Sequence, residues 1–527
     1  MTEFHNPYNF VPALPRADVR GDLGDHAPVD AHSRWADEGW SGRIRVSLTT
    51  ITPLLVPDAS RMTEDSDSHH KTFPVREGPD GRPRLAVTSV KGMLRAAYET
   101  VTNSRMGIFR GHDRPLGRRM ATQEALSLVP ARIEERAGRL QIRLMSAARL
   151  RQYPLAQPLS LGSLPDSKQR VDAHIQWGKV VDIFAEGTAP AGVGSPVTGW
   201  VHATNWNIKG KSHERLFFNN MAQPEYRELT EEILTAWEDL ITDYQEAHDE
   251  EDVWERKRPD STVAAPEEYL GADPGKTAWS PHVYQDGNPR RDNKTPQRDA
   301  KALVDGTLCY AKLGPGEVVE RLYPVLISRD LFPVAPEKLL DASLKAPKKL
   351  DELSPADRVF GWAHPDGHGA HRAQVRIGTI WCERADAIEP FALPGVPLAV
   401  LGQPKPQQGR FYVAKSPRGE AQEKKEKGLT PIDAGYHPGK GLRGRKVYPH
   451  HKELPTNYWQ NPAQDRTQRA NGRHYQEYRR PKGARERDGQ NRSILGWVNP
   501  NTRFTFTGDV LNLSSVELGA LLWLSSL

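Results

Sequence analysis

The sequence places two cations directly after a candidate helix start. Apolar side chains repeat there at helical spacing, at Val90, Leu94, Ala97 and Tyr98. The pattern predicts a helix that begins near Thr88 or Ser89, either of which can cap it. A helix start attracts anions through its unpaired N–H groups, and Lys91 and Arg95 lie four residues apart on one face. An anion site and an ordinary solvated helix both fit this segment.

A second cationic segment lies between residues 439 and 451, where glycines separate the charges. Four cations fall within seven residues: Lys440, Arg443, Arg445 and Lys446. Glycine lets a backbone fold around phosphates, and arginine binds a phosphate through two hydrogen bonds. Tyr448 and His450 follow and could contact the same ligand. A phosphate cradle and a flexible basic loop are both compatible with this composition.

A shorter run of charge precedes the apolar residues 216–218. Its cations are Lys209, Lys211 and Arg215. Phosphate contact and a solvated turn are equally compatible with this run.

Carboxylates and histidines gather in the loop 58–71, at Glu64, Asp65, Asp67, His69 and His70. Clustered carboxylates can hold Mg²⁺ through water for phosphodiester cleavage, which makes Asp65, Asp67 and His70 the candidate catalytic residues. The histidines of this loop, or His450 and His451, could instead act as general acid and base without a metal. A solvated loop is the third interpretation.

Composition indicates a globular chain. The 527 residues (59.0 kDa) allow three or four domains at roughly 150 residues each. Mean hydropathy is −0.67, and no stretch of about 18 apolar residues predicts a membrane-spanning helix, so no membrane partner is expected. The N-terminus lacks a secretory pattern. Cys309 and Cys382 are too few for a four-cysteine zinc site or a disulfide framework, so we expect a reducing cytoplasm.

The net charge of +5 is unevenly distributed. Residues 401–492 hold 21 Lys and Arg against 9 Asp and Glu, a net of +12, which leaves −7 for the rest of the chain. A basic block on a mildly acidic body favours a surface that binds a polyanion. Aromatic residues are interleaved with these cations, at Tyr412, Tyr436, Tyr448, Tyr458, Trp459, Tyr475 and Tyr478. Because bases stack on aromatic rings while Lys and Arg hold phosphates, the mixture favours unpaired nucleic acid.

Hydrophobic periodicity predicts an α+β protein. Strands are expected over 43–49, 140–144, 180–184, 199–203, 321–328, 373–380 and 504–510. An amphipathic helix is expected from residue 225 to about 248. Ser514 and Glu517 form a capping box ahead of a final helix that ends near Leu524.

These elements divide the chain into six predicted parts. They are an extended arm (1–40), the first part of the core (41–220), a helical and charged insertion (221–300), the second part of the core (301–400), a basic RNA-binding insertion with aromatics (401–492), and a C-terminal strand and helix that complete the core (493–527). Residues 249–300 and 460–492 are expected to be poorly ordered on their own.

Several short motifs, in order along the chain, resemble those of one family. Residues 87–95 resemble the strand and Ser-x-Lys-Gly-x-Leu-Arg helix of the RAMP superfamily, the repeat-associated subunits of CRISPR effector complexes. Residues 356–361 (Ala-Asp-Arg-Val-Phe-Gly) and 516–522 (Val-Glu-Leu-Gly-Ala-Leu-Leu) look like two further RAMP elements. Three more segments resemble a long-chain RAMP subgroup associated with type III systems: 6–12, 211–218 and 443–451.

The resemblance implies a ferredoxin-like (RRM-like) RAMP fold with large loop insertions. Such subunits form the backbone of the complex, bind guide RNA through its phosphates and kink it with a projecting thumb. By position, Ser89, Lys91 and Arg95 would contact the guide backbone. Binding of this kind needs no cofactor, and the implied partners are guide RNA, target RNA and other CRISPR-associated subunits.

Type III backbone subunits of this superfamily can also cut target RNA, with a divalent metal and an Asp in the loop after the first strand. The corresponding position here is Thr72, so this chain departs from the pattern. Asp65 and Asp67 lie nearby and could substitute if the loop folds differently. Mg²⁺ would be needed only for such cleavage, and the resemblance leaves enzymatic activity open.

The combined interpretation is a guide-RNA-binding subunit of an antiviral CRISPR ribonucleoprotein. One alternative is an endoribonuclease that cuts target RNA with metal, or precursor guide RNA with histidine. Another is a scaffold subunit that contacts no RNA and docks a neighbour through the acidic helix 229–244. The first interpretation requires distant cations to converge, so that Lys91 and Arg95 share a surface with residues 443–446.

Overall fold

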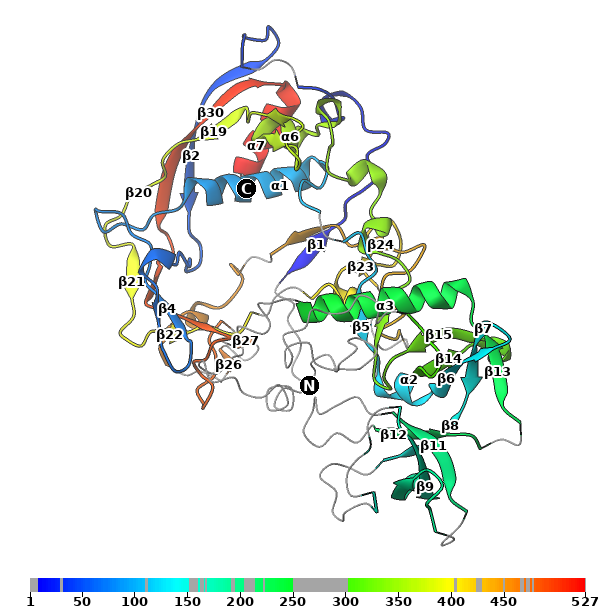
Figure 1. Cartoon of the computed structure of the whole chain (residues 1–527). Coiled ribbons are helices and arrows are strands. Elements are labelled where there is room, and N and C mark those ends of the chain that lie inside the picture. The colour runs from blue at the N-terminus through cyan, green and yellow to red at the C-terminus, as the bar shows by residue number, and fades with distance from the viewer. Residues whose placement is uncertain are drawn as a thin grey trace. The chain divides into compact units, whose positions relative to one another are not determined.

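The computed structural model divides the chain into two compact units (Figure 1). Unit 1 combines Met1–Leu116 with Pro333–Leu527, and unit 2 is the continuous segment Gly117–Phe332. The described residues are 8–28, 32–109, 112–150, 160–161, 165, 168–190, 195–202, 214–220, 223–249, 302–401, 405–422, 429–448, 451–464, 469–470, 474–475 and 478–526. The boundaries differ from the predicted ones, because residues 117–220 belong to unit 2 and not with 41–116.

The central sheet of unit 1 is antiparallel and joins the two ends of the chain. Its strands are β2 (Trp40–Thr49), β30 (Arg503–Leu513), β19 (Val375–Ile377) and β20 (Trp381–Cys382), with β30 in the middle. The alternation seen in the sequence is confirmed, since Phe504, Phe506 and Val510 are buried while Arg503 and Asp509 are exposed.

Three helices cover one face of this sheet (Figure 1). They are α1 (Val87–Val101), α6 (Pro355–Phe360) and α7 (Ser515–Ser525). Tyr98, Phe360 and Leu521 pack together with Val510 of β30, so the helices and the sheet share one apolar core. The predicted capping box of α7 is confirmed: the Glu517 N–H donates to Ser514 Oγ, and the Ser514 N–H donates to Glu517 Oε2, both at 3.2 Å.

The rest of unit 1 consists of short strand pairs. They are β1 (Asn9–Val11) with β25 (Arg445–Val447), β3 (Thr63–Glu64) and β4 (Lys71–Phe73) with β28 (Arg492–Ile494) and β22 (Val396–Pro397), β21 (Ile388–Pro390) with β29 (Gly496–Val498), β17 (Trp362–Ala363) with β18 (Ala370–His371), β23 (Val413–Ala414) with β24 (Gly441–Leu442), and β26 (Arg469–Ala470) with β27 (His474–Tyr475). Within 460–492, strand pairing places residues 469–470 against 474–475, Arg479 against Leu398, and Arg492 against Lys71. Residues 250–301 lie outside the described residues.

Unit 2 contains a five-stranded sheet packed against a long helix. The sheet order is β13 (Glu225–Glu228), β7 (Arg139–Leu144), β6 (Val129–Arg136), β14 (Leu308–Leu313) and β15 (Val319–Tyr323). The helix α3 (Glu231–Asp249) buries Trp237 and Tyr244 in the core of this unit. It begins later than predicted, because residues 225–228 pair with β7 instead. The short helix α2 (Thr122–Leu126) and the pair β5 (Gly117–Arg119) and β16 (Arg329–Leu331) complete this part.

The second part of unit 2 is a closed barrel. Its strands are β8 (Ser146–Arg149), β9 (Arg170–Gln176), β10 (Lys179–Ala185), β11 (Val197–His202) and β12 (Arg215–Phe218). Small and branched side chains fill its core, including Ala148, Val171, Ile183, Val201 and Leu216.

The chain is a mixed α+β protein dominated by sheets, as predicted. The finer prediction, a ferredoxin-like arrangement, stays a prediction. Among the described residues, no helix combines the length and the apolar character needed to cross a membrane.

Candidate nucleic-acid interface

The helix α1 positions the first predicted cations. It begins at Val87 and has Ala86 as its N-cap, so Thr88 and Ser89 lie in the first turn and do not cap it as predicted. Ser89 is exposed, and its N–H bonds to the carbonyl of Ala86 at 3.0 Å. The sequence runs on as a helix because Val90 and Tyr98 are buried on one side.

Arg95 holds helix α6 in place. Its guanidinium donates to Asp357 Oδ1 at 2.9 Å and to the carbonyl of Gly361 at 2.5 Å. Asp357 is 1% exposed and also accepts hydrogen bonds from the N–H and hydroxyl of Ser354 at 3.2 and 2.5 Å. Burial raises the pKa of Asp357, and the hydrogen bonds from Ser354 and the charge of Arg95 oppose this effect. Arg95 therefore acts within the fold, and contact with RNA would involve only its exposed edge.

The three helical motifs of the sequence meet in one buried network. Arg358, next to Asp357, donates to Glu517 Oε1 of α7 at 2.8 Å, and the two side chains are 3% and 6% exposed. Thus α6 connects α1 through Asp357 and α7 through Arg358. The network fixes the start of α1 relative to the segment that follows α6.

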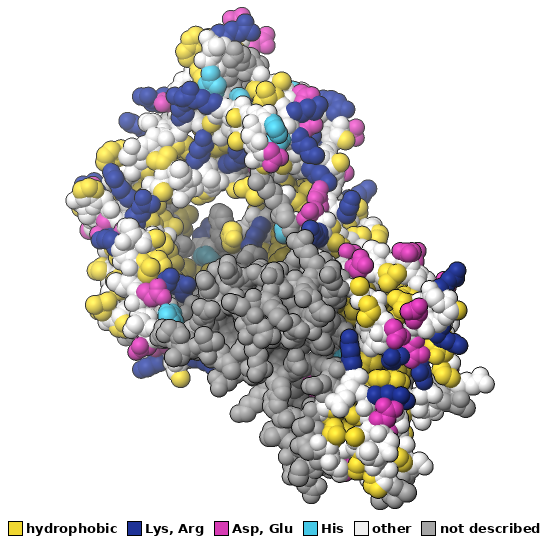
Figure 2. All heavy atoms as spheres, in the orientation of Figure 1, with side chains coloured by type: hydrophobic (Ala, Val, Ile, Leu, Met, Phe, Trp, Pro, Cys, Tyr) yellow, Lys and Arg dark blue, Asp and Glu magenta, His cyan; other side chains and the backbone are white. Residues whose placement is uncertain are grey.

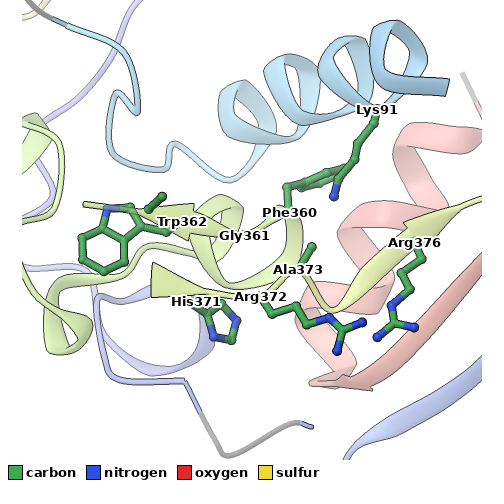
Figure 3. Close-up of a pocket in the computed structure, with 9 residues that line it drawn as sticks. Lys91, Phe360, Gly361, Trp362, His371, Arg372, Ala373 and Arg376 are labelled. Carbon is green, nitrogen blue, oxygen red and sulfur yellow. The ribbon is translucent and has the colours of Figure 1, made fainter. Parts of the chain in front are cut away.

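A cavity of about 470 Å³ lies beside the first turns of α1. Its lining residues are Lys91, Phe360, Gly361, Trp362, Ala363, His371, Arg372, Ala373 and Arg376. Figure 3 shows Lys91 reaching down from α1, with Arg372 and Arg376 extending beside each other from the segment around β19. No carboxylate lines the cavity, and within the described part of the chain none of its three cations forms an ion pair.

The electrostatics of this cavity favour an anion. Burial, and then the nearby charge of Arg95, lower the pKa of Lys91. His371 adds no positive charge to the cavity, because burial lowers its pKa. Its Nε2 lies 3.0 Å from the carbonyl oxygen of Arg358. A phosphate in this cavity could form charge-assisted hydrogen bonds with Lys91, Arg372 and Arg376, which all line it.

The basic segment 439–448 uses two of its four cations internally. Arg445 is buried, forms an ion pair with Glu99 at 3.4 Å, and donates to Asn103 Oδ1 at 3.0 Å and to the carbonyl of Ser104. Lys440 donates to Gln422 Oε1 at 3.0 Å and to the carbonyl of Asp433. Their predicted role as surface RNA contacts is therefore corrected, because the strand β25 points Arg445 into the protein.

The other two cations lie among aromatic rings. Lys446 Nζ is 4.0 Å from the ring centre of Tyr8 and 5.4 Å from that of Tyr448, and the guanidinium of Arg443 is 5.1 Å from that of Phe10. We call these five residues the aromatic–cation surface. It forms because β1 pairs with β25, placing Phe10 opposite Lys446.

Tyr8 is anchored within this surface, whereas Tyr448 is free to meet a ligand. The Tyr8 hydroxyl donates to the Tyr412 hydroxyl at 3.2 Å, and burial and this bond raise the pKa of Tyr8 to about 12. Tyr448 is 67% exposed. A rigid ring beside a cation, with a second ring facing solvent, suits an unpaired base and its phosphate.

Helix α1 contacts both the cavity and strand β25. Lys91, Arg95 and Glu99 are spaced four residues apart and therefore follow one side of the helix, over a rise of about 12 Å. Lys91 faces the cavity, and Glu99 holds Arg445 of β25. Helix α1 thus contacts both predicted segments, through Lys91 and through Arg445. Lys446 follows Arg445 in β25 and points to the opposite face of the strand, so the single shared RNA surface stays a prediction.

Comparison with known families gives a match to the model of the RAMP superfamily over residues 47–143. The matched segment contains all of α1 and so includes Lys91 and Arg95. No curated protein matches the chain. The match over this segment supports a RAMP-family, CRISPR-associated protein that binds RNA and works with other subunits.

The acidic and histidine-rich loop forms the β3–β4 hairpin. Asp65 Oδ1 accepts the N–H of Asp67 at 3.2 Å and the N–H and hydroxyl of Ser68 at 2.8 and 2.7 Å, so it shapes the turn. The hydrogen bonds from Ser68 lower the pKa of Asp65. Thr72 pairs with Thr63 and Ser493 within the strands.

This hairpin does not match the predicted catalytic arrangement. His70 is buried, with Nδ1 3.1 Å from the carbonyl of Asp488 and Nε2 2.8 Å from Ser493 Oγ, so neither nitrogen is available for proton transfer. Asp67 is exposed beside Asp65. Among the described residues no three His, Cys, Asp or Glu side chains are grouped as metal ligands. The role predicted for His70 is therefore corrected, while Mg²⁺ binding by Asp65 and Asp67 stays a prediction.

The remaining predicted contacts divide between unit 2 and the undescribed segments. Arg215 lies on β12 opposite Arg149, and burial lowers its pKa. Lys209, Lys211 and His450 lie outside the described residues.

Most aromatic residues of the basic block pack within the protein. Tyr436 and Tyr458 are buried, and Trp459 stacks on Tyr478 with ring centres 5.3 Å apart. The prediction that they stack on bases is therefore wrong for these four, while Tyr412 and Tyr448 lie at the aromatic–cation surface. Tyr475 belongs to β27, and its side chain is not described.

Sequence reasoning missed Arg372 and Arg376. Arg376 was predicted only as part of a strand, and the spacing of four residues between the two arginines gave no motif. Their role depends on α6 and β18 folding back beside α1, which no local pattern shows.

Proposed function

We propose that this RAMP protein is a guide-RNA-binding, backbone-type subunit of a type III-associated CRISPR effector ribonucleoprotein in antiviral defence. The observation that carries the proposal is the cavity in which Lys91, Arg372 and Arg376 converge without a carboxylate. A single anion between two arginines and a lysine is a typical phosphate arrangement.

The proposed path of the guide continues along α1. A phosphate in the cavity would be followed by nucleotides that run toward the aromatic–cation surface, where Tyr448 stacks on a base and Lys446 meets a phosphate. Sequence would be read by pairing of the guide with target RNA, not by the protein. Because the cations supply the charge directly, binding needs no cofactor and should persist in EDTA.

The test is the salt dependence of guide-RNA binding. In the triple variant K91A/R372A/R376A, the slope of log K against log salt should fall by about 2, since each lost contact to a single strand removes about 0.7. The measurement is fluorescence anisotropy with a labelled single-stranded RNA over a salt series.

The matched control is K349A. Lys349 is an exposed cation of unit 1 that pairs with Asp351 at 3.0 Å. Its removal should leave both slope and affinity unchanged. If the triple variant keeps the wild-type slope and still assembles with other subunits, the cavity is no RNA site and the scaffold interpretation is favoured.

A further inference from the structure

The barrel of unit 2 has the strand neighbours of an oligonucleotide-binding barrel. Around the barrel the order is β8, β12, β11, β9 and β10, with four antiparallel pairs and one parallel pair, β10 with β8. An OB barrel has this same cycle when its chain is opened between its second and third strands. In that fold the hairpin between strands four and five is one of two loops that hold the ligand. The equivalent hairpin here joins β9 to β10.

The tip of this hairpin carries an unfavourable residue. Its two residues, Trp177 and Gly178, have φ angles of +53° and +69°, the arrangement of a type I′ turn, which favours Asn-Gly. A bulky side chain in the left-handed region is strained. Trp177 is also 97% exposed. The β6–β7 hairpin of the same unit makes the equivalent turn with Ala137 and Gly138, at +50° and +74°, so the turn does not require the indole.

Cations surround this tip. Arg149 lies opposite both Lys179 and Arg215, so the three side chains point to one side of the barrel. The Arg149 N–H donates to the carbonyl of Gly178 at 2.8 Å, which joins the end of β8 to the hairpin. Among the described residues, Glu214 is a carboxylate whose charge acts on Arg215. The described residues at this end of the barrel thus include the three cations Arg149, Lys179 and Arg215.

The rest of the same barrel face is covered. Phe217 of β12 and Ala147 of β8 pack into the core of the five-stranded sheet, and Phe217 contacts Tyr310 with ring centres 5.2 Å apart. A ligand could not lie along the whole outer face of β8 and β12. It would be confined to the rim formed by Trp177, Lys179 and Arg149.

We propose that this rim is a second nucleic-acid contact that binds an unpaired RNA segment. The indole of Trp177 stacks on a base, and Lys179 and Arg149 hold the adjacent phosphates. That the ligand is RNA rests on the proposed function; the contact itself does not depend on the cavity beside α1. Stacking explains why a strained, exposed tryptophan occupies a turn that a smaller residue would stabilise.

The test uses the full chain with labelled oligouridine, measured by anisotropy, together with thermal unfolding. W177A should bind about tenfold more weakly, and W177F should bind nearly as the wild type does. W177N is the sharpest variant, because it should bind as weakly as W177A while its melting temperature is unchanged or higher. The control is L126A, which removes another exposed apolar side chain of unit 2 and should have no effect.

Two outcomes would overturn the proposal. The first is wild-type RNA binding by W177A and W177N. The second is unchanged RNA binding with lost assembly of other subunits, which would make the rim a protein-docking site. Parallel measurement of K91A/R372A/R376A separates this proposal from the previous one: weak binding by the tryptophan variants with normal binding by the triple variant would remove only the cavity assignment.

Discussion

The cavity beside α1 and the basic segment 439–448 both concentrate positive charge but use it differently. In the cavity, Lys91, Arg372 and Arg376 come from separate segments and meet without a carboxylate. In the basic segment, which is far denser in sequence, Arg445 and Lys440 are satisfied by the protein itself. On the face seen in Figure 2, Lys and Arg side chains are spread over unit 1 with Asp and Glu among them, so local charge density does not mark the site.

The difference teaches that a dense run of cations in the sequence does not by itself make a ligand site, because the fold decides which of them are buried and engaged and which are exposed. A buried guanidinium needs hydrogen-bond partners to offset its desolvation, and Arg445 finds them in Glu99, Asn103 and Ser104. An exposed ammonium such as Lys446 has no such need. Three predictions distinguish groups that stabilise the fold from exposed groups that could bind a ligand.

The largest effect is expected for R445M, which breaks a buried ion pair and leaves Glu99 without its partner. The free energy of unfolding should fall by about 3 kcal/mol, measured by denaturant unfolding. K446M, one residue away and exposed, should change it by no more than about 0.5 kcal/mol. Equal losses in the two variants would contradict the assigned burial of Arg445.

The loss in R445M should also depend on pH. Burial already raises the pKa of Glu99, and Arg445 opposes that rise. Without Arg445 the folded-state pKa rises further above the unfolded value. As pH rises, Glu99 ionises in the unfolded chain before it ionises in the folded one, and this favours unfolding. The loss of unfolding free energy in R445M is therefore complete above the folded-state pKa of Glu99, and it shrinks as pH falls toward about 4.

An intermediate effect is expected for Y448A at the aromatic–cation surface. Loss of one stacking ring should weaken RNA binding about tenfold with little change in stability, because the side chain is exposed. W35A removes another exposed aromatic of unit 1 and serves as the control. Equal affinities of Y448A and the wild type would show that the surface has no stacking role.

The smallest effect is expected for D65N in the β3–β4 hairpin. The asparagine oxygen can accept the same three hydrogen bonds from Asp67 and Ser68, so the melting temperature should shift by about 2 °C or less. Any RNA cleavage by the assembled complex should continue at the wild-type rate. Abolished cleavage in D65N would restore the predicted catalytic role of Asp65.

The sequence predicted those features that depend on neighbours in the chain. The helix from residue 87 and the capping box of Ser514 and Glu517 follow from local spacing and hydrogen bonding, and both are present. The alternation of polar and apolar residues along β30 likewise predicts which of its faces is buried. The match to the RAMP superfamily over 47–143 confirms the resemblance drawn from short motifs.

What the sequence could not predict depends on register and on tertiary contact. Arg445 and Lys446 are adjacent and equally charged, and only the pairing of β25 with β1 decides which of them is buried. Arg372 and Arg376 gain their place when α6 is fixed by Arg95 and Arg358. Trp177 can be identified as a candidate ligand contact only when its turn conformation and its exposure are known.

The pairing of β2 with β30 has a consequence for synthesis on the ribosome. Arg43 and Asp509, which form an ion pair across these strands, are 466 residues apart in the chain. At a translation rate of about 5–20 residues per second, β2 must wait on the order of half a minute or longer for its partner. Unit 2 is continuous and can fold in that interval. The central sheet of unit 1 is therefore the last part to form during synthesis, and β2 lacks its strand partner until β30 has been made.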